Sequence, residues 1–427
     1  MYSQGMLALY VAVIGIAVTA VAIFFGLRGW LTGSRDEFID IRKHLREERV
    51  TTLATAAFGY YSGLKGDMYH GGGEGAEYTG PVLYKRDWLP ASPMKLERVR
   101  IILEMNADRQ NEYGSILKKA SKLLPHRPGA IWFHNYHRYS QAVSTLDRPS
   151  LFSNRNAYRL LSVEPDHDSF SLRFTAGKYF DHHDTEEVLA YEIARYFVKH
   201  DDDRAAPETL PRMKVRETAG YPANFGTRCA VAGINTLTVY ENEGRFEFVL
   251  HRRSERDVAQ GKGSVHVIPA GEFQPTNDGA EALSEDFDLW KNIMREYDEE
   301  LLGTHDQEAR PVPDYAADKP FRELDEARKT GRLQLYFLGV VIDPINLKPQ
   351  ILTCAVFHGS SFQEIFRKPV TRDDEGTVLW SGSGKKFTGY AFNPSNLLSQ
   401  ASYPASPTTQ ALLRIASRNT ERLCGAG

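Results

Sequence analysis

The chain has few cysteines and almost no net charge, and both shortages restrict what it can be. Its 427 residues include three cysteines, Cys229, Cys354 and Cys424, which lie far apart and form no CxxC pair. We therefore expect neither a disulfide framework nor a cysteine zinc site, and a reducing compartment fits this composition. The formal net charge is −3, so the chain has no overall attraction for nucleic acid and no DNA partner is expected.

Charge is missing altogether from one run near the start. Residues 6–27 (MLALYVAVIGIAVTAVAIFFGL) contain no Asp, Glu, Lys or Arg over 22 positions. At a rise of ~1.5 Å per residue, a helix of this length would span a bilayer core of about 30 Å. A cleaved signal peptide is the alternative. The run is longer than the roughly 7–15 apolar residues of that class, however, and no basic residue precedes it.

Basic residues follow this run, namely Arg28, Arg35, Arg42, Lys43, Arg46 and Arg49. The positive-inside rule then places the C-terminal bulk of the chain in the cytoplasm. We expect a single-pass protein of the cell membrane with the lipid bilayer as a partner. We also expect homo-oligomers, because one membrane helix cannot form a pore alone.

The chain divides into four predicted segments. Residues 1–33 hold the transmembrane anchor, and residues 34–80 hold an amphipathic helix followed by a glycine-rich linker. That helix is compatible with a membrane surface, with a bundle of like chains, or with a plain connection. Residues 81–220 form an α+β accessory region, and residues 221–427 form a second α+β domain.

The accessory region contains two predicted strands, 157–165 and 170–180, separated by a turn. The tetrapeptide Asp184-Thr185-Glu186-Glu187 is typical of a capping box, and it predicts a helix that begins there and runs to Lys199. His182 and His183 precede it. They are candidate metal ligands, but the capping box explains this segment without a metal.

The C-terminal half alternates strand patterns with helical ones. Residues rich in β-branched and aromatic side chains predict strands over 234–242, 245–253, 264–271, 332–343 and 351–359. A helix is predicted over 288–303, capped by Asp286 and ended by Gly303. Short helices are predicted over 394–400 and 408–417.

The predicted helix over 288–303 carries the hexapeptide Arg295-Glu296-Tyr297-Asp298-Glu299-Glu300. Glu296 and Glu300 are four residues apart and share a face, with Glu299 beside them. Like charges at that spacing weaken an isolated helix. Inward-facing carboxylates are also how proteins collect Mg²⁺ or Mn²⁺ around a phosphate. An acidic, solvated helix face is the alternative.

The order of strand, Pro-Ala-Gly, loop and acidic helix resembles the Nudix domain. That family's box is a glycine, five residues, a glutamate, seven residues, then Arg-Glu-aliphatic-any-Glu-Glu-any-Gly. The resemblance implies that Glu296, Glu299 and Glu300 ligand a divalent metal, with Mg²⁺ as the cofactor. It implies that Arg295 orients an acid by ion pairing, and that Gly271 opens the ligand site at the end of the preceding strand.

The box is altered in its first part. Gly271 lies 24 residues before Arg295, about ten more than the family's box allows. Phe287 stands where the box has its first glutamate, although Glu285 and Asp286 are near and are candidate general bases. The acids of the metal core are retained while the loop before them is rebuilt. Hydrolysis is therefore less strongly implied than ligand binding.

Two arginines extend the candidate ligand site. Arg252 and Arg253 end the strand before SVHVIPAG, and their guanidinium groups are candidate donors to ligand phosphates. Solvated charges at a sheet edge are the alternative.

The resemblance extends over residues 81–418, which are similar to the C-terminal half of a group of actinobacterial regulators. In that group a helix-turn-helix precedes a ligand-sensing Nudix-like region. The stretches that carry the similarity are 148–152, 178–181, 287–290 and 320–322. With the DNA reader replaced by a membrane anchor, the architecture resembles the transmembrane–Nudix effectors of CBASS antiphage systems.

These patterns predict an α+β fold with a single N-terminal transmembrane helix followed by a Nudix-like mixed β-sheet flanked by helices. Three functions stay open. The first is a membrane-anchored sensor that binds a nucleotide or cyclic nucleotide and signals to the membrane in antiphage defence. The second is a Mg²⁺-dependent Nudix hydrolase of nucleoside diphosphate-linked substrates. The third is a membrane-tethered scaffold whose acidic helix is structural.

Overall fold

The structure is a computed structural model of the full chain. It describes residues 34–50, 52–61, 68–70, 80–105, 113–127, 135–149, 152–200, 210–253, 264–304, 311–367, 376–379, 389–402 and 405–425. For residues 68–70, 253 and 376–379 it describes the backbone alone.

The predicted transmembrane helix over residues 6–27 lies outside the described residues. Within the described part of the chain, no helix is both long enough and apolar enough to cross a membrane. Spanning a bilayer takes about 20 apolar residues in one helix, whereas α9 (Leu289–Leu302), for example, has 14 residues and is amphipathic. This finding corrects the predicted fold class and localisation. The fold class that the structure supports is mixed α+β, without a transmembrane helix among the described elements.

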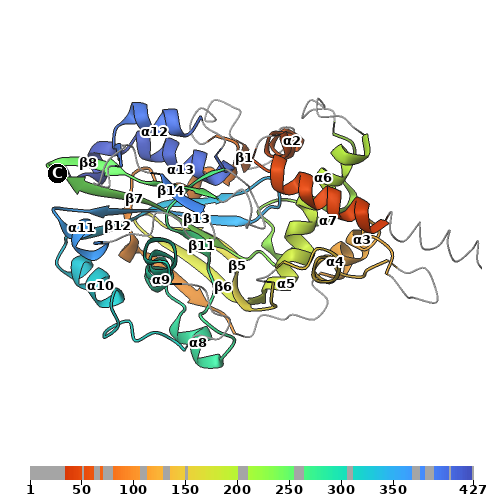
Figure 1. The fold of residues 1–427 in the computed structure, drawn as a ribbon, viewed down its shortest axis with the longest axis horizontal. Coiled ribbons are helices and arrows are strands. Elements are labelled where there is room, and N and C mark those ends of the chain that lie inside the picture. Colours follow the sequence, from red (N-terminus) through yellow and green to blue (C-terminus); the bar gives the residue numbers. More distant parts are fainter. Residues whose placement is uncertain are drawn as a thin grey trace, which may run out of the picture.

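A mixed sheet forms the centre of the molecule, with the strand order β1-β2-β12-β13-β7-β8-β15 (Figure 1). β11 also pairs with β7, and β3 also pairs with β12. The strands are β1 (Met68–His70), β2 (Leu83–Lys85), β3 (Met94–Lys95), β7 (Gly233–Asn242), β8 (Arg245–Phe248), β11 (Ala270–Glu272), β12 (Leu333–Ile342), β13 (Pro349–Phe357) and β15 (Tyr390–Ala391). β13 and β7 run parallel to each other, and the other pairs are antiparallel.

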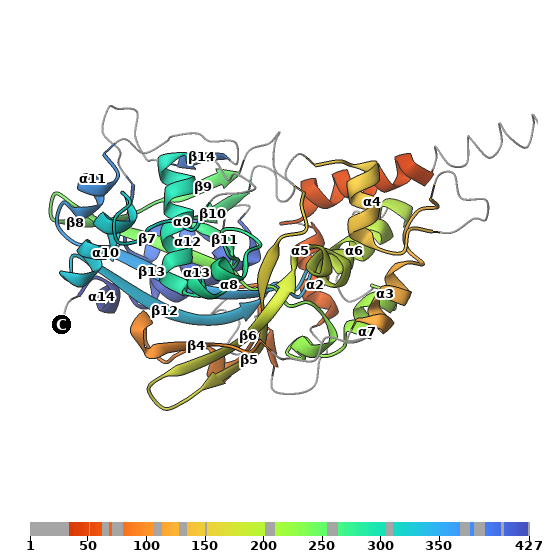
Figure 2. The same cartoon turned by 90° about the horizontal axis from the view of Figure 1, so that it is seen from below.

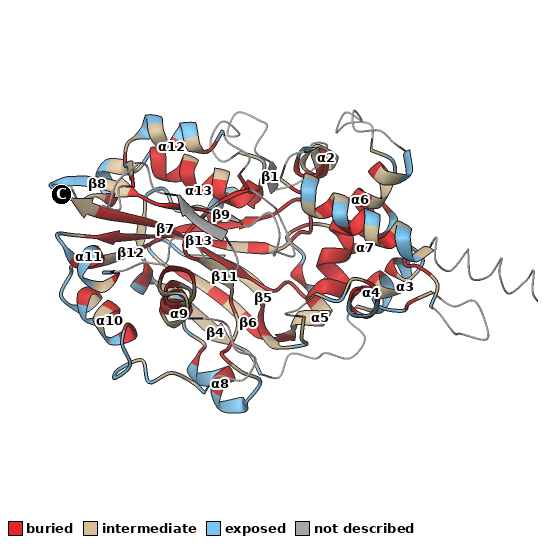
Figure 3. Ribbon diagram, viewed as in Figure 1, coloured by how far each residue is buried: buried red, intermediate tan, exposed pale blue. Residues whose placement is uncertain are grey.

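Helices cover both faces of this sheet because each face is apolar. α9 and α10 (Phe321–Lys329) lie on one face, where Ile293 and Tyr297 join a core cluster with Ile351. α12 (Pro394–Gln400) and α13 (Pro407–Ser417) lie on the other face, in a second cluster. Figure 3 shows the buried positions concentrated along β7, β12 and β13 between these two layers.

Two smaller sheets flank the central one. The first has the order β10-β9-β14, built from β9 (Leu250–Arg253), β10 (Val265–Val267) and β14 (Gly376–Leu379). The second has the order β4-β6-β5, built from β4 (Val99–Leu103), β5 (Asn156–Pro165) and β6 (Phe170–Lys178). Figure 2 shows this second sheet below the central sheet, with one end of β5 and β6 reaching toward the helices on the right. The predicted strand pair with its turn in the accessory region is confirmed as β5 and β6.

A helical part packs against one end of the sheets (Figures 1 and 2). It contains a helix over residues 34–48 together with α2 (Thr52–Tyr60), α3 (Gly114–Ala120), α4 (Tyr139–Leu146), α5 (Tyr179–His182), α6 (Val188–His200) and α7 (Lys214–Ala219). A π-helical turn, His183–Glu187, joins α5 to α6. The shorter helices elsewhere are α8 (Ala280–Glu285), α11 (Ser361–Ile365) and α14 (Thr420–Leu423), with single 3₁₀ turns at Arg86–Trp88, Leu96–Arg98 and Phe225–Thr227.

The amphipathic helix predicted from residue 34 is present over 34–48. Its apolar residues Phe38, Ile41 and Leu45 are 1%, 0% and 3% exposed. Phe38 contacts the rings of Tyr139 and Tyr191, at centroid distances of 6.1 and 5.3 Å. The apolar face of this helix is therefore covered by the chain itself.

Strand pairing crosses the domain boundary expected near residue 220. β2 and β3 precede that boundary, yet both pair with β12. The backbone of β5 also bonds across it, because Tyr158 N donates to Phe273 O at 3.0 Å. The accessory region and the region after residue 220 thus share one sheet and one core cluster.

Candidate functional site

The acidic hexapeptide lies on α9, as the sequence predicted. The helix begins after Asp288, whose carboxylate accepts from the backbone N–H groups of Trp290 and Lys291 at 2.7 and 3.0 Å. It ends at Gly303, which has a φ of 72° in the left-handed region. The N-cap is therefore Asp288 and not Asp286, while the predicted C-terminal glycine is confirmed. Leu289, Ile293 and Tyr297 are buried on one stripe, also as predicted.

Arg295 is held in place by a closed set of contacts. Its side chain is 10% exposed and makes an ion pair with Asp286 at 3.3 Å. Its guanidinium donates to Tyr315 Oη at 2.6 Å, to Gln274 O at 2.6 Å and to Asn292 Oδ1 at 3.0 Å. Burial alone would lower the pKa of Arg295, but Tyr315 and Asp286 raise it. The guanidinium therefore stays charged and fixed in orientation.

Asp286 is fully buried beside Arg295, and its ion pair with Arg295 helps to fix the guanidinium. One carboxylate oxygen accepts from the Tyr315 hydroxyl at 2.6 Å, and the other accepts from Thr276 N and Oγ1 at 2.8 and 2.6 Å. Both oxygens are thus committed to the protein, so this geometry makes Asp286 a positioning residue rather than a general base.

The altered spacing of the Nudix-like box has a structural explanation. The extra residues between Gly271 and Arg295 contain α8, and Asp286 follows directly at the C-terminal end of that short helix. The longer connection therefore still returns an acid to the arginine of α9. The ion pair expected for this arginine is present with Asp286, one position earlier than the glutamate of the box.

Two of the three candidate metal ligands lie against β11. Glu300 Oε1 accepts from the backbone N–H of Ala270 at 2.9 Å, and Glu300 is only 6% exposed. Glu296 Oε1 accepts from Asn292 Nδ2 at 3.3 Å. The Glu296 carboxylate lies directly over Gly271, because a β-carbon built on that glycine would overlap it. An added β-carbon at this position would have to displace the end of the Glu296 side chain.

The remaining acids of α9 are Asp298 and Glu299. Asp298 accepts from the Thr304 hydroxyl at 2.9 Å, just beyond the C-terminal end of the helix. Glu299 is partly exposed. Among the residues that the structure describes, no three His, Cys, Asp or Glu side chains lie close enough together to hold a metal ion. The donor chemistry suits Mg²⁺, but in this arrangement Glu296, Glu299 and Glu300 do not form a metal centre.

Three further candidates lie outside this network. Glu285 is mostly exposed, with Lys291 Nζ 3.8 Å from its carboxylate and 2.6 Å from its backbone carbonyl. Arg252 is exposed on β9, which pairs with β10 and β14 in a separate sheet. Arg253 shares that strand, and only its backbone is described. The structure thus brings Arg295, Glu296, Glu300, Gly271 and Asp286 together and leaves these three apart.

The sequence reasoning missed Asn292, Tyr315 and Thr276. Asn292 contacts both Arg295 and Glu296, and its position three residues before Arg295 on a helix was a usable signal. Tyr315 and Thr276 lie outside α9, and neither belongs to a motif. Only the tertiary fold brings them to Asp286.

A second cluster of buried charge lies in the helical part, at the π-helical turn His183–Glu187. Each of its acids binds an arginine from a distant element: Asp184 with Arg138 at 2.9 Å, Glu186 with Arg228 at 2.9 Å, and Glu187 with Arg49 at 3.0 Å. The capping-box prediction for this segment is therefore wrong, because α5 and the π-helical turn precede α6 without a break and the acids serve tertiary contacts. π-Helical turns are rare, and they are frequently found at functional sites.

The two histidines of this cluster differ in their surroundings. His182 Nδ1 lies 2.6 Å from Glu186 Oε2, with both side chains buried. His183 is 4% exposed, and neither of its ring nitrogens has a hydrogen-bond partner in the described part of the chain. Burial lowers the pKa of His183 to about 3. Neither histidine belongs to a group that could hold a metal ion among the described residues.

Comparisons with known proteins add little to this geometry. No family model matches the chain, and no curated protein matches it. Among solved structures, one similar chain is described as a C. elegans Ap4A hydrolase binary complex. It is 16% identical, and the match covers 44% of this chain and 96% of that one with a TM-score of 0.20. A likeness of this size marks a distant structural neighbour and carries no argument about activity.

Proposed function

We propose that the region around β11 and α9 is a Nudix-like module that binds a nucleotide-type ligand and acts as a sensor rather than as a hydrolase. The resemblance of the acidic helix, its preceding strand and its Arg295–Asp286 ion pair to the Nudix domain supports the ligand class. Cyclic nucleotides belong to that class, as the similarity to antiphage effectors implies.

One observation carries the choice of binding over hydrolysis. Glu300 and Glu296 are held against the backbone of β11 and by Asn292, instead of being gathered with Glu299 around a common point. A Nudix-type hydrolase needs these acids to share a divalent metal that polarises phosphates. In the proposed sensor they keep α9 and β11 in register.

A second candidate, the Mg²⁺-dependent hydrolase, is favoured by a different observation. Arg295 is fixed by Asp286 and Tyr315 with its charge retained, which is the role that the family assigns to this arginine. A structural scaffold is the third candidate. If the protein is a scaffold, we expect that it neither binds the ligand nor turns it over.

One experiment separates these functions. The full chain is titrated with a panel of nucleoside diphosphate-linked compounds and cyclic nucleotides by calorimetry, once with Mg²⁺ and once with EDTA, and product formation is followed in parallel. The full chain is needed because residues 34–61 contribute to the core. The sensor binds at least one compound in EDTA and releases no product. Turnover that requires Mg²⁺ supports the hydrolase, and no binding under either condition supports the scaffold.

Replacing Glu299 with Gln tests the hydrolase directly. If Glu299 is a metal ligand, Glu299→Gln will lower turnover by about 10²-fold or more, since metal-assisted charge stabilisation contributes several kcal/mol. If the module is a sensor, the variant will bind the nucleotide within about twofold of the unaltered chain, because a partly exposed carboxylate contributes little. Glu326→Gln, at an exposed position of α10, is the matched control.

Replacing Gly271 with Ala tests whether the contact between β11 and α9 matters for the ligand. The added methyl group will displace the flexible Glu296 carboxylate, so the free energy of unfolding should change by no more than about 1 kcal/mol. Nucleotide affinity should fall by about tenfold or more if this contact shapes the site. Gly114→Ala is the control, because a β-carbon there meets nothing within 4 Å. Equal affinities of the two variants would contradict a site at β11.

A further inference from the structure

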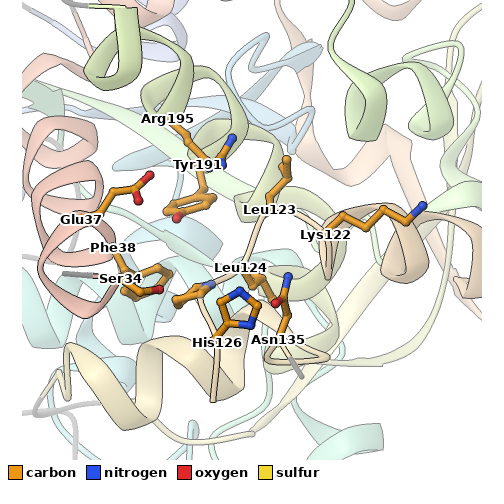
Figure 4. A pocket seen from close by; sticks show the side chains of 11 residues that line it. Ser34, Glu37, Phe38, Lys122, Leu123, Leu124, His126, Asn135, Tyr191 and Arg195 are labelled. Carbon is orange, nitrogen blue, oxygen red and sulfur yellow. The ribbon is translucent and has the colours of Figure 1, made fainter. Parts of the chain in front are cut away.

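A pocket of about 400 Å³ is lined by residues of the helical part. The helices of that part lie away from α9 in both views of the fold (Figures 1 and 2). Its walls come from the helix over residues 34–48, from α6, and from residues 122–126 after α3. Figure 4 shows its side chains, with the Tyr191 ring of α6 turned toward the helix that carries Glu37 and Phe38 and the Arg195 side chain above that ring. A volume of this size is within the range of small-molecule sites.

The lining combines an apolar wall with one uncompensated cation. Phe38 and Leu124 are 1% and 3% exposed and form the apolar wall. Glu37 makes an ion pair with Lys199 at 2.8 Å, so its charge is already balanced. Arg195 makes no hydrogen bond or ion pair with any residue that the structure describes. Lys122 and His126 are the other basic residues among the described residues of the lining, and the Lys122 side chain extends away from Arg195 in Figure 4.

Tyr191 of α6 also lines this pocket. Tyr191 is only 1% exposed, yet its hydroxyl donates to no group within the described ranges. Arg195 is among the charges that act on this hydroxyl. The guanidinium and the hydroxyl are therefore two donors from one helix that have no acceptor among the described residues.

We propose that this pocket binds a small organic anion, with its carboxylate or phosphate group on Arg195 and the Tyr191 hydroxyl and its apolar body against Phe38 and Leu124. The guanidinium supplies a fork of donors that matches an oxyanion, and the hydroxyl supplies a further donor. The acidic face of α9 takes no part, so this site is separate from the proposed nucleotide site. Because one wall is the helix over residues 34–48, a bound anion also ties that helix to α6.

The test uses the full chain and three probes of one size: phenyl phosphate, benzoate and the uncharged benzyl alcohol. Calorimetric titration up to about 10 mM covers the affinities expected of such small ligands. We expect one or both anions to bind and to raise the unfolding temperature, and benzyl alcohol to bind at least about tenfold more weakly. The two anions also show which oxyanion the donors prefer.

Two variants locate the site. Arg195→Gln should weaken anion binding by about tenfold or more, because it removes a charge-assisted pair of hydrogen bonds. Tyr191→Phe should weaken it by about threefold to tenfold while the ring that packs on Phe38 remains. Arg322→Gln, at an exposed position of α10, is the control and should bind as the unaltered chain does. Arg195 is only partly buried, so its variant is expected to fold, and thermal unfolding checks both variants.

Three results would overturn the proposal. The first is that neither anion binds up to the highest concentration. The second is that benzyl alcohol binds as tightly as the anions. The third is that Arg195→Gln and Arg322→Gln have the same affinity.

Discussion

Replacing Arg228 with Met will lower the free energy of unfolding by about 3–5 kcal/mol, as measured by chemical denaturation at neutral pH. Arg228 and Glu186 both have fully buried side chains, and they form an ion pair at 2.9 Å. The guanidinium also donates to the backbone carbonyls of Pro222, Asn224 and Leu347, at 2.6, 3.0 and 3.0 Å. The variant leaves all of these acceptors buried without their donor.

Burial governs the electrostatics of this pair. It raises the pKa of Glu186 well above its usual range, against the opposing effect of Arg228, and it lowers the pKa of Arg228. Once Arg228 is gone, Glu186 loses its ion-pair partner and keeps the weaker attraction of Lys348 and the contact with His182. The double variant Arg228→Met with Glu186→Leu should therefore recover part of the lost stability, because the stranded carboxylate is removed as well.

An exposed pair supplies the control. Arg173 bonds Glu104 and Glu164 at 2.7 and 2.9 Å, but its side chain is 39% exposed. Arg173→Met should change the free energy of unfolding far less than Arg228→Met does, because solvent screens such pairs. A similar loss of stability for the Arg173 and Arg228 variants would contradict the view that burial makes the ion pairs of the π-helical turn important for stability.

Local sequence patterns predicted many helices and strands of the fold, but they did not predict the buried ion pairs of the π-helical turn. Alternating and β-branched residues located β5, β6, β7, β12 and β13, and Gly303 marked the end of α9. The sequence Asp184–Glu187 matched a capping box, in which acids satisfy nearby backbone groups. In the fold, Asp184 binds Arg138 and Glu187 binds Arg49, at separations of 46 and 138 residues. Contacts of that separation leave no trace in a local pattern.

In the candidate site, too, the sequence predicted the local element but not the tertiary contacts. The REYDEE stretch correctly marked a helix that follows a Pro-Ala-Gly strand, and Arg295 does pair with an acid. What the sequence could not determine was the direction of the carboxylates. Glu296 and Glu300 turn toward β11, which depends on the close approach at Gly271 and on Asn292. Spacing on a helix places side chains on one face, but the neighbouring strand decides what they bind.

Replacing His183 with Phe will flatten the dependence of stability on pH between about pH 4.5 and 6.5. The folded pKa of His183 is about 3, far below the value of 6.5 for an ordinary histidine, and burial is the main cause. Between these two values the unfolded chain binds a proton at this residue and the folded chain does not. Stability must therefore fall as the pH is lowered through this range, by up to about 1.4 kcal/mol per pH unit from this residue.

The surroundings of His183 explain why protonation is unfavourable. Its ring packs against Phe152, Tyr179 and Tyr139 at centroid distances of 4.9, 4.6 and 6.4 Å. Arg42, Lys348 and Arg49 add positive charge that lowers its pKa further, and Glu187 alone acts in the opposite direction. The imidazole is therefore an aromatic ring within an aromatic cage. Phenylalanine can occupy the same place, and its ring cannot be protonated.

The measurement is the free energy of unfolding of both chains from pH 7.5 to pH 4.5. Over the roughly 2 pH units between the ordinary pKa and the lowest pH measured, His183 is expected to remove at most about 3 kcal/mol from the unaltered chain. His182 also has a pKa well below the usual range, chiefly through burial, so the variant should keep a slope of roughly half the original in this window. His167→Phe is the control, because the His167 side chain is 94% exposed and its replacement should leave the slope as it is. If His183→Phe retains the full slope, the imidazole already carries a proton in the folded chain, and its two ring nitrogens must then have acceptors that this packing does not supply.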